Sequence, residues 1–77
     1  MRKVNDDIYL NRAEAIDYLI AAYSLKWCNT KWSPKGIMIS WQDAEGNLKS
    51  KTVLAYKLKK SRVARMKKRD LDFAFML

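Results

Sequence analysis

The chain has 77 residues and a formal net charge of +8, with 16 Lys and Arg against 8 Asp and Glu and no histidine. This length excludes a multidomain enzyme, and the missing histidine excludes serine-type triads, imidazole general bases and the usual zinc sites. Because 49% of the residues are hydrophobic and 12% are aromatic, the composition predicts an ordered globular domain rather than a disordered chain.

The first predicted element is an amphipathic helix that begins at Arg12. Asn11 is a suitable N-cap, and Glu14 follows it at the spacing of a capping box. Apolar side chains then recur at helical spacing, which predicts a helix that continues to Trp27 or Cys28. The residues on this apolar face are Ile16, Leu19, Ile20, Tyr23 and Trp27.

A loop and a strand are predicted next. Residues 29–36 are expected to form the loop, because Pro34 disfavours helix at the residue before it and Gly36 permits unusual backbone angles. Residues 37–42 alternate between apolar and more polar side chains, which predicts a strand with one buried face. The inner face of this strand carries Ile37, Ile39 and Trp41.

The strand is expected to continue into an antiparallel hairpin. Residues 43–47 have the composition of a four- or five-residue turn, in which Gly46 can adopt a left-handed conformation. The return strand is predicted from Leu48 to about Leu58, half-buried, with a lysine-rich outer face. Its inner face carries Leu54, Tyr56 and Leu58, and its outer face carries Lys49, Lys51, Lys57 and Lys59, interrupted by Val53 and Ala55.

Two further elements are predicted after the hairpin. Ser61 is a plausible N-cap for a short second helix, with Val63 and Met66 turned towards the core. Its basic stripe would consist of Arg62, Arg65 and Arg69. The alternating tail over residues 71–77 predicts a C-terminal strand, with a helix as the alternative. We expect this apolar tail to be buried in the core, against a partner, or in a homodimer interface.

Together these elements predict one small α+β domain that spans residues 1–77. An N-terminal amphipathic helix packs on an antiparallel β-hairpin, and a short basic helix and a C-terminal strand follow.

The single cysteine and the N-terminal sequence indicate a cytoplasmic protein. Cys28 cannot form an intramolecular disulfide, whereas small secreted domains normally depend on several. No signal-peptide-like run follows the first residues, and no 18 consecutive residues are apolar. We therefore expect a reducing compartment and no membrane span, with Cys28 acting as a small buried hydrophobic residue rather than a reactive thiol.

The positive charge is concentrated in one part of the sequence. Residues 1–46 sum to zero, whereas residues 47–69, here called the basic stretch, hold ten basic groups and no acidic group. Such a block draws polyanions by releasing their condensed counterions, which predicts nucleic-acid binding. The alternative is a solvated face that only keeps the protein soluble. The basic stretch contributes Lys49, Lys51, Lys57, Lys59, Lys60, Arg62, Arg65, Lys67, Lys68 and Arg69 to the expected site.

Aromatic residues near lysines give the expected site a second component. Rings stack on unpaired bases while ammonium groups contact phosphates, a combination typical of proteins that bind RNA or single strands. Trp32, in the predicted polar loop between Lys31 and Lys35, is expected to be exposed and to join this surface. The other candidates, Tyr23, Trp27, Trp41 and Tyr56, are expected in the core.

These features predict a non-catalytic nucleic-acid-binding protein, with RNA or single strands slightly preferred over duplex DNA. The carboxylate pairs lie at termini or in a turn, and two glycines are too few for a glycine-rich phosphate loop. We therefore expect no catalytic residues, no metal and no cofactor. The alternative is a small inhibitor or adaptor of the mobile-element or phage type, which docks on an acidic surface of a larger protein or ribonucleoprotein.

Overall fold

The computed structural model describes residues 1–76 and places two antiparallel sheets around two helices. In chain order the elements are β1 (Arg2–Val4), β2 (Asp7–Leu10), α1 (Arg12–Tyr23), β3 (Trp27–Ser33), β4 (Gly36–Gln42), β5 (Leu48–Val53), β6 (Tyr56–Lys57), β7 (Ala64–Lys67) and α2 (Lys68–Met76). The strand orders are β1-β2-β7-β6 and β3-β4-β5. The α+β class is confirmed, but two strands precede the first helix, which the sequence did not indicate.

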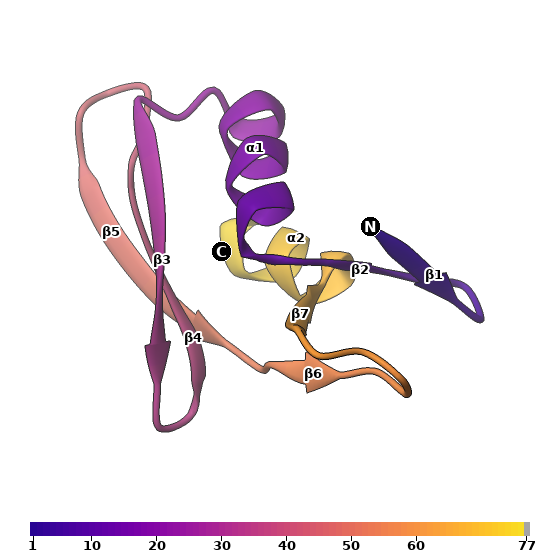
Figure 1. Cartoon of the computed structure of the whole chain (residues 1–77). Helices are drawn as coiled ribbons and strands as arrows, with labels where there is room; N and C mark the ends of the chain where they lie inside the picture. Colours follow the sequence, from indigo (N-terminus) through magenta and orange to yellow (C-terminus); the bar gives the residue numbers. More distant parts are fainter. Residues whose placement is uncertain (77) are drawn as a thin grey trace.

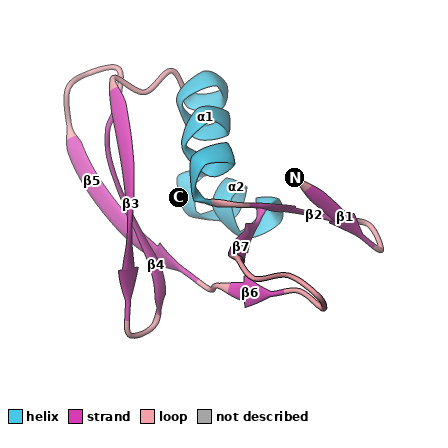
Figure 2. Ribbon diagram, viewed as in Figure 1, coloured by secondary structure: helices cyan, strands magenta, loops and turns pink. Residues whose placement is uncertain are grey.

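The two sheets lie on different sides of the helices. Figure 1 shows the β3-β4-β5 sheet upright beside α1, and the small strands of the other sheet extending away from it. Both helices pack on one face of the three-stranded sheet and leave its other face uncovered (Figure 2). Within residues 1–76, neither helix is long and apolar enough to cross a membrane.

Helix α1 begins where the sequence predicts and ends earlier. The Asn11 side chain accepts a bond from the Glu14 N–H at 2.8 Å, and Glu14 accepts one from the Asn11 N–H at 2.9 Å, which confirms both halves of the capping box. Ser24 is left-handed, with φ of 53°, and caps the helix end. The predicted extension to Trp27 or Cys28 is therefore wrong, because these residues pair with β4 instead.

Most of the predicted loop over residues 29–36 is strand β3. Only Pro34 and Lys35 form the turn that joins β3 to β4. The loop prediction fails because polar residues occupy both faces of β3 and hide its alternation. Thr30 points inward and is 3% exposed, and its hydroxyl accepts a bond from Arg12 Nε on α1 at 2.8 Å.

The β4-β5 hairpin and its turn are confirmed, but the return strand differs from the prediction. It ends at Val53 instead of Leu58, and its faces are reversed, since Val53 is 7% exposed and Leu54 is 60% exposed. The register places Lys49 and Lys51 on the inner face, on the free edge of the sheet, where their long side chains reach solvent. The predicted inner residues of β4, Ile37, Ile39 and Trp41, are all buried.

Residues 56–67 form a second hairpin instead of the predicted second helix. Strand β6 pairs with β7, which also pairs with β2, so backbone pairing overrides the weak helical pattern. Arg62, Arg65 and Arg69 lie in the turn, in β7 and in α2 respectively, and the predicted stripe does not exist. Met66 is fully buried, as predicted, whereas Val63 is exposed, contrary to the prediction.

The C-terminal tail is a helix, so the alternative is confirmed and the predicted strand is wrong. Leu71 and Ala74 are buried, and Phe75 stacks on Trp41 with the ring centroids 4.0 Å apart. Their spacing of three and four residues places them on one face of α2, which closes the core. Leu77, the last residue of the predicted strand, lies outside the described residues, and a homodimer through this segment remains a prediction.

Candidate nucleic-acid interface

The ten basic residues of the basic stretch divide into two sets. One set lies within ion-pair distance of carboxylates and comprises Lys49, Arg65, Lys67, Lys68 and Arg69. The other set has no such partner among residues 1–76 and comprises Lys51, Lys57, Lys59, Lys60 and Arg62, here called the unpaired cations. A ligand phosphate can reach the second set without displacing a carboxylate of the protein.

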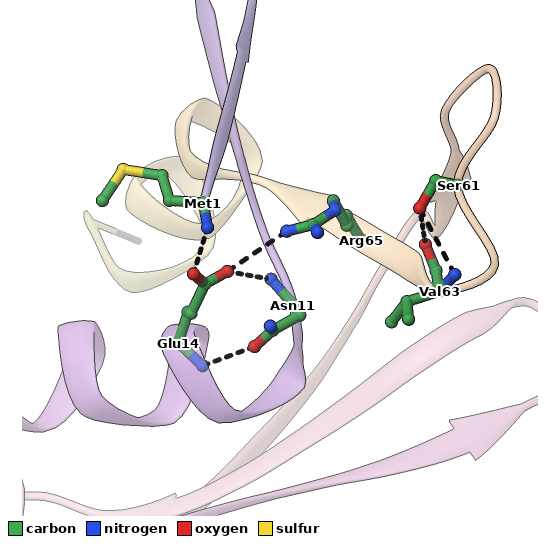
Figure 3. Close-up of polar contacts among 6 residues, drawn as sticks. All are labelled: Met1, Asn11, Glu14, Ser61, Val63 and Arg65. Carbon is green, nitrogen blue, oxygen red and sulfur yellow. Dashed lines mark hydrogen bonds and ion pairs between the residues drawn. The ribbon is translucent and has the colours of Figure 1, made fainter.

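Arg65 belongs to a polar cluster around the carboxylate of Glu14 (Figure 3). Glu14 accepts bonds from the N-terminal ammonium of Met1, from Arg65 at 3.2 Å and from the Asn11 N–H at 2.9 Å. The hydrogen bond from the ammonium and that from Asn11 hold the pKa of Glu14 below its ordinary value. The Arg65 side chain is only 15% exposed, so it joins β7 to α1 rather than facing a ligand.

Lys68 lies in a cluster that joins the two helices. Asp72 of α2 accepts bonds from Lys68 at 2.9 Å, from Tyr23 at 2.9 Å and from Tyr18. Burial opposes ionisation of Asp72, but these three donors outweigh it and hold the pKa of the carboxyl below its usual value. The hydrogen bond that Lys68 donates to Asp72, followed by its hydrogen bond with Tyr18, raises the pKa of Lys68.

Lys67 and Arg69 share one carboxylate, that of Asp7 on β2. Arg69 lies 2.7 Å from it and Lys67 lies 3.9 Å from it. The Lys67 ammonium also lies 4.8 Å from the ring centroid of Tyr56 and 5.8 Å from that of Tyr9. Lys67 is therefore held by a carboxylate and two rings, in an arrangement that links β2, β6 and β7.

Four of the five unpaired cations lie on the β6-β7 hairpin: Lys57, Lys59, Lys60 and Arg62, all exposed. The turn between the strands has a defined shape, because the Ser61 N–H donates to the Leu58 carbonyl at 3.0 Å. The Ser61 hydroxyl also bonds the backbone of Val63 at 3.0 and 3.3 Å (Figure 3). Lys60 adopts a left-handed conformation in this turn, with φ of 64°. The hairpin thus presents its cations from an ordered backbone.

The predicted residues outside the basic stretch lie near the β3-β4 turn. Lys31 and Lys35 are exposed and have no ion-pair partner in the described part of the chain. Gly36, with φ of +145°, abuts β5 so closely that a Cβ there would lie 2.2 Å from the Val53 carbonyl oxygen. Because β5 leads into β6, the turn and the β6-β7 hairpin lie towards the same end of the molecule (Figure 1).

The three tryptophans occupy different environments. Trp41 is 5% exposed and in the core, as predicted, and Trp32 is 53% exposed, also as predicted. The guanidinium of Arg12 lies 5.8 Å from the centroid of Trp32 and occupies one side of its ring. Trp27 was predicted to be in the core, which is wrong, because it is 41% exposed. It lies on the opposite face of β3 from Trp32, so the two rings cannot form one platform.

Sequence reasoning missed Trp27 as a candidate because it assigned residue 27 to the end of a helix. The usable signal was the alternation of Cys28 and Thr30, which pack inward, with Trp27 and Asn29, which point outward. Cys28 itself is half-buried against the core, and this burial raises the pKa of its thiol to about 11, in keeping with the predicted hydrophobic role.

The comparisons with known proteins give no indication of a function for this chain. Residues 1–76 contain no cluster of three or more Cys, Asp or Glu side chains that could hold a metal ion. No family model, no curated protein and no solved structure matches the chain. The charges, the exposed rings and their positions are therefore the basis for assigning a function.

Proposed function

We propose that this protein binds nucleic acid without catalysing a reaction, using the unpaired cations as its phosphate contacts. One observation carries this proposal: the acidic residues neutralise one half of the basic stretch and leave the other half without counterions. Cations of this kind replace the condensed counterions of a polyanion and gain free energy by releasing them. The proposal includes a slight preference for RNA or single strands and a cytoplasmic location.

The ion pairs give the two halves of the basic stretch different roles. Arg65, Lys67 and Lys68, all part of the predicted site, hold the hairpin and α2 in place and do not contact the ligand. Arg69 also pairs with Asp7, but its side chain is 70% exposed, so it remains a candidate contact. Lys49 remains a candidate contact, because its side chain is 57% exposed although it lies 3.6 Å from Asp43. Trp32 and Lys35 extend the surface from the β3-β4 turn, whereas Lys31 lies on the opposite face of β3 from Trp32.

A variant of the hairpin tests the proposal directly. Lys57→Ala, Lys59→Ala, Lys60→Ala and Arg62→Ala together should weaken binding by about 10³-fold at roughly 0.15 M salt, if each cation contacts one phosphate. The loss should be similar for all sequences, because phosphate contacts carry no sequence information. Fluorescence anisotropy with labelled oligonucleotides measures the affinity, and circular dichroism checks the fold.

A matched pair of double variants separates position from net charge. Lys57→Ala with Lys59→Ala, and Lys3→Ala with Lys26→Ala, each remove two exposed charges that have no ion-pair partner within residues 1–76. The hairpin double should lose about 30-fold in affinity, and the control double less than about 3-fold. Equal losses would show that net charge alone attracts the ligand and would contradict the proposed site.

The second candidate function, an inhibitor or adaptor that docks on a protein, has one observation in its favour. Leu54 and Phe73 are 60% and 65% exposed, and together with Lys51 they line a hollow of about 330 Å³. Asp70 also lines this hollow, so the feature that favours a protein partner is the pair of exposed apolar side chains rather than the charge. In that case Phe73→Ser should abolish partner binding, whereas nucleic-acid affinity would not depend on Phe73.

A further inference from the structure

The face of the β3-β4-β5 sheet that points away from both helices has no partner in the fold. Residues paired across antiparallel strands share one face, so the register defines this surface, here called the open face. Its three cross-strand rows are Trp27, Gln42 and Leu48, then Asn29, Ser40 and Ser50, then Lys31, Met38 and Thr52. None of these nine residues is acidic, and a lysine lies at one end of the face.

A hollow of about 310 Å³ opens on this face, lined by Trp27, Ser40, Trp41, Leu48, Lys49 and Ser50. Trp27 and Leu48 are long side chains on the two outer strands, 41% and 72% exposed. Between them, Gln42 donates a hydrogen bond to the Gly46 carbonyl at 3.0 Å, which turns its side chain towards the turn between β4 and β5. The short side chains of Ser40 and Ser50 form the floor.

The Trp27 side of this hollow is free for a stacked aromatic ring. The Trp27 indole takes part in no ring stacking and no cation–π contact among the described residues. One wall is therefore an unused π surface, and the floor offers hydroxyl groups that can donate and accept hydrogen bonds.

Charge favours a nucleic acid as the occupant. Lys31 lies on the open face itself, four residues beyond Trp27 on β3. Lys49 also lines the hollow, from the free edge of the sheet, but its side chain belongs to the inner face and its ammonium lies 3.6 Å from Asp43. A phosphate of the bound strand would therefore meet Lys31 on this face, and no carboxylate lines the hollow.

We propose that this hollow binds one unpaired nucleobase of a single strand, stacked on Trp27 and hydrogen-bonded by Ser40 and Ser50. Bases in a duplex cannot enter, because their faces are covered by their neighbours in the stack. RNA and DNA strands are bound alike, since the contacts involve the base and not the sugar. The inference rests on the proposed function, and it explains the preference for single strands.

The test compares single strands and duplexes of one sequence by fluorescence anisotropy. Trp27→Ala should weaken binding of single-stranded RNA and DNA by about 5- to 150-fold, the range for one base–aromatic stack. Duplex affinity should change by less than about 2-fold. Trp27→Phe retains a stacking ring and should recover most of the loss, and Phe73→Ala, a matched exposed aromatic away from the hollow, should have no effect.

A second variant shows whether the loss of binding by Trp27→Ala comes from the hollow or from a change in folding. Ser50→Ile fills the hollow from an exposed position with a side chain that offers no stacking ring and leaves Trp27 in place, and it should weaken single-strand binding as Trp27→Ala does. Wild-type affinity for single strands in both variants would overturn this inference, while a loss of all binding in the hairpin variant would still support the proposed function. A wild-type protein that binds neither single strands nor duplexes would overturn both.

Discussion

The two halves of the basic stretch have the same charge in the sequence and different environments in the fold. In the second half, Arg65, Lys67, Lys68 and Arg69 each lie within 4 Å of a carboxylate that belongs to another element or to the same helix. In the first half, the hairpin cations project from an ordered turn and have no partner within residues 1–76. Charge density in the sequence therefore identifies a candidate surface, while ion pairing in the fold decides which of its cations a ligand can use.

The largest expected contrast in stability lies between Arg65 and Lys59. Arg65→Ala removes a mostly buried partner of Glu14 and should lower the free energy of unfolding by about 1.5–3 kcal/mol, the range for hydrogen bonds to charged groups. Lys59→Ala removes an exposed, unpaired side chain and should change that free energy by no more than about 0.5 kcal/mol. Urea denaturation followed by circular dichroism measures both values. Equal changes in the free energy of unfolding for the two variants would contradict the claim that the ion-paired cations stabilise the fold and the unpaired cations do not.

A smaller effect should appear in the pH dependence of stability at Asp72. Its pKa is lowered in the folded state, so its stabilising contribution is complete above the unfolded-state pKa, about 4, and is lost as the pH falls through the folded-state value. Asp72→Asn should therefore cost about 1 kcal/mol at pH 7 and less near pH 2. Thermal denaturation at both pH values measures the difference in Tm between variant and wild type, and the same difference at both would contradict the assigned role.

The correct predictions of the fold concern elements that are determined by residues close together in the sequence. The capping box at Asn11, the alternation of β4 and the turn around Gly46 each depend on a few neighbouring residues, and all three are present. The wrong predictions concern strands whose partners are distant in the chain. Strand β7 pairs with β2, about 57 residues away, and nothing near Ala64 in the sequence indicates that pairing.

The sequence predicted which residues carry the positive charge of the candidate site, but not which of them lie together on an accessible surface. The sequence supplied all ten cations, but it could not show that Glu14 and Asp7 would fold back onto Arg65, Lys67 and Arg69. The pair of Lys68 and Asp72, four residues apart on α2, was missed because the tail was predicted to be a strand. The open face was missed for a related reason. Trp27 reaches it only because α1 ends at Ser24, whose left-handed conformation has no strong signature in the residues around it.

The salt dependence of binding by the wild-type protein shows whether the unpaired cations contact phosphates. If the five unpaired cations contact phosphates, a plot of log affinity against log salt concentration should have a slope of about −3.5 to −4.5 or steeper, and the four hairpin substitutions should make it shallower by about 2.8 to 3.6. Isothermal titrations at several salt concentrations with one oligonucleotide measure both slopes. A wild-type slope shallower than about −1, or a slope that the hairpin substitutions leave unchanged, would contradict the claim that these cations form the nucleic-acid interface.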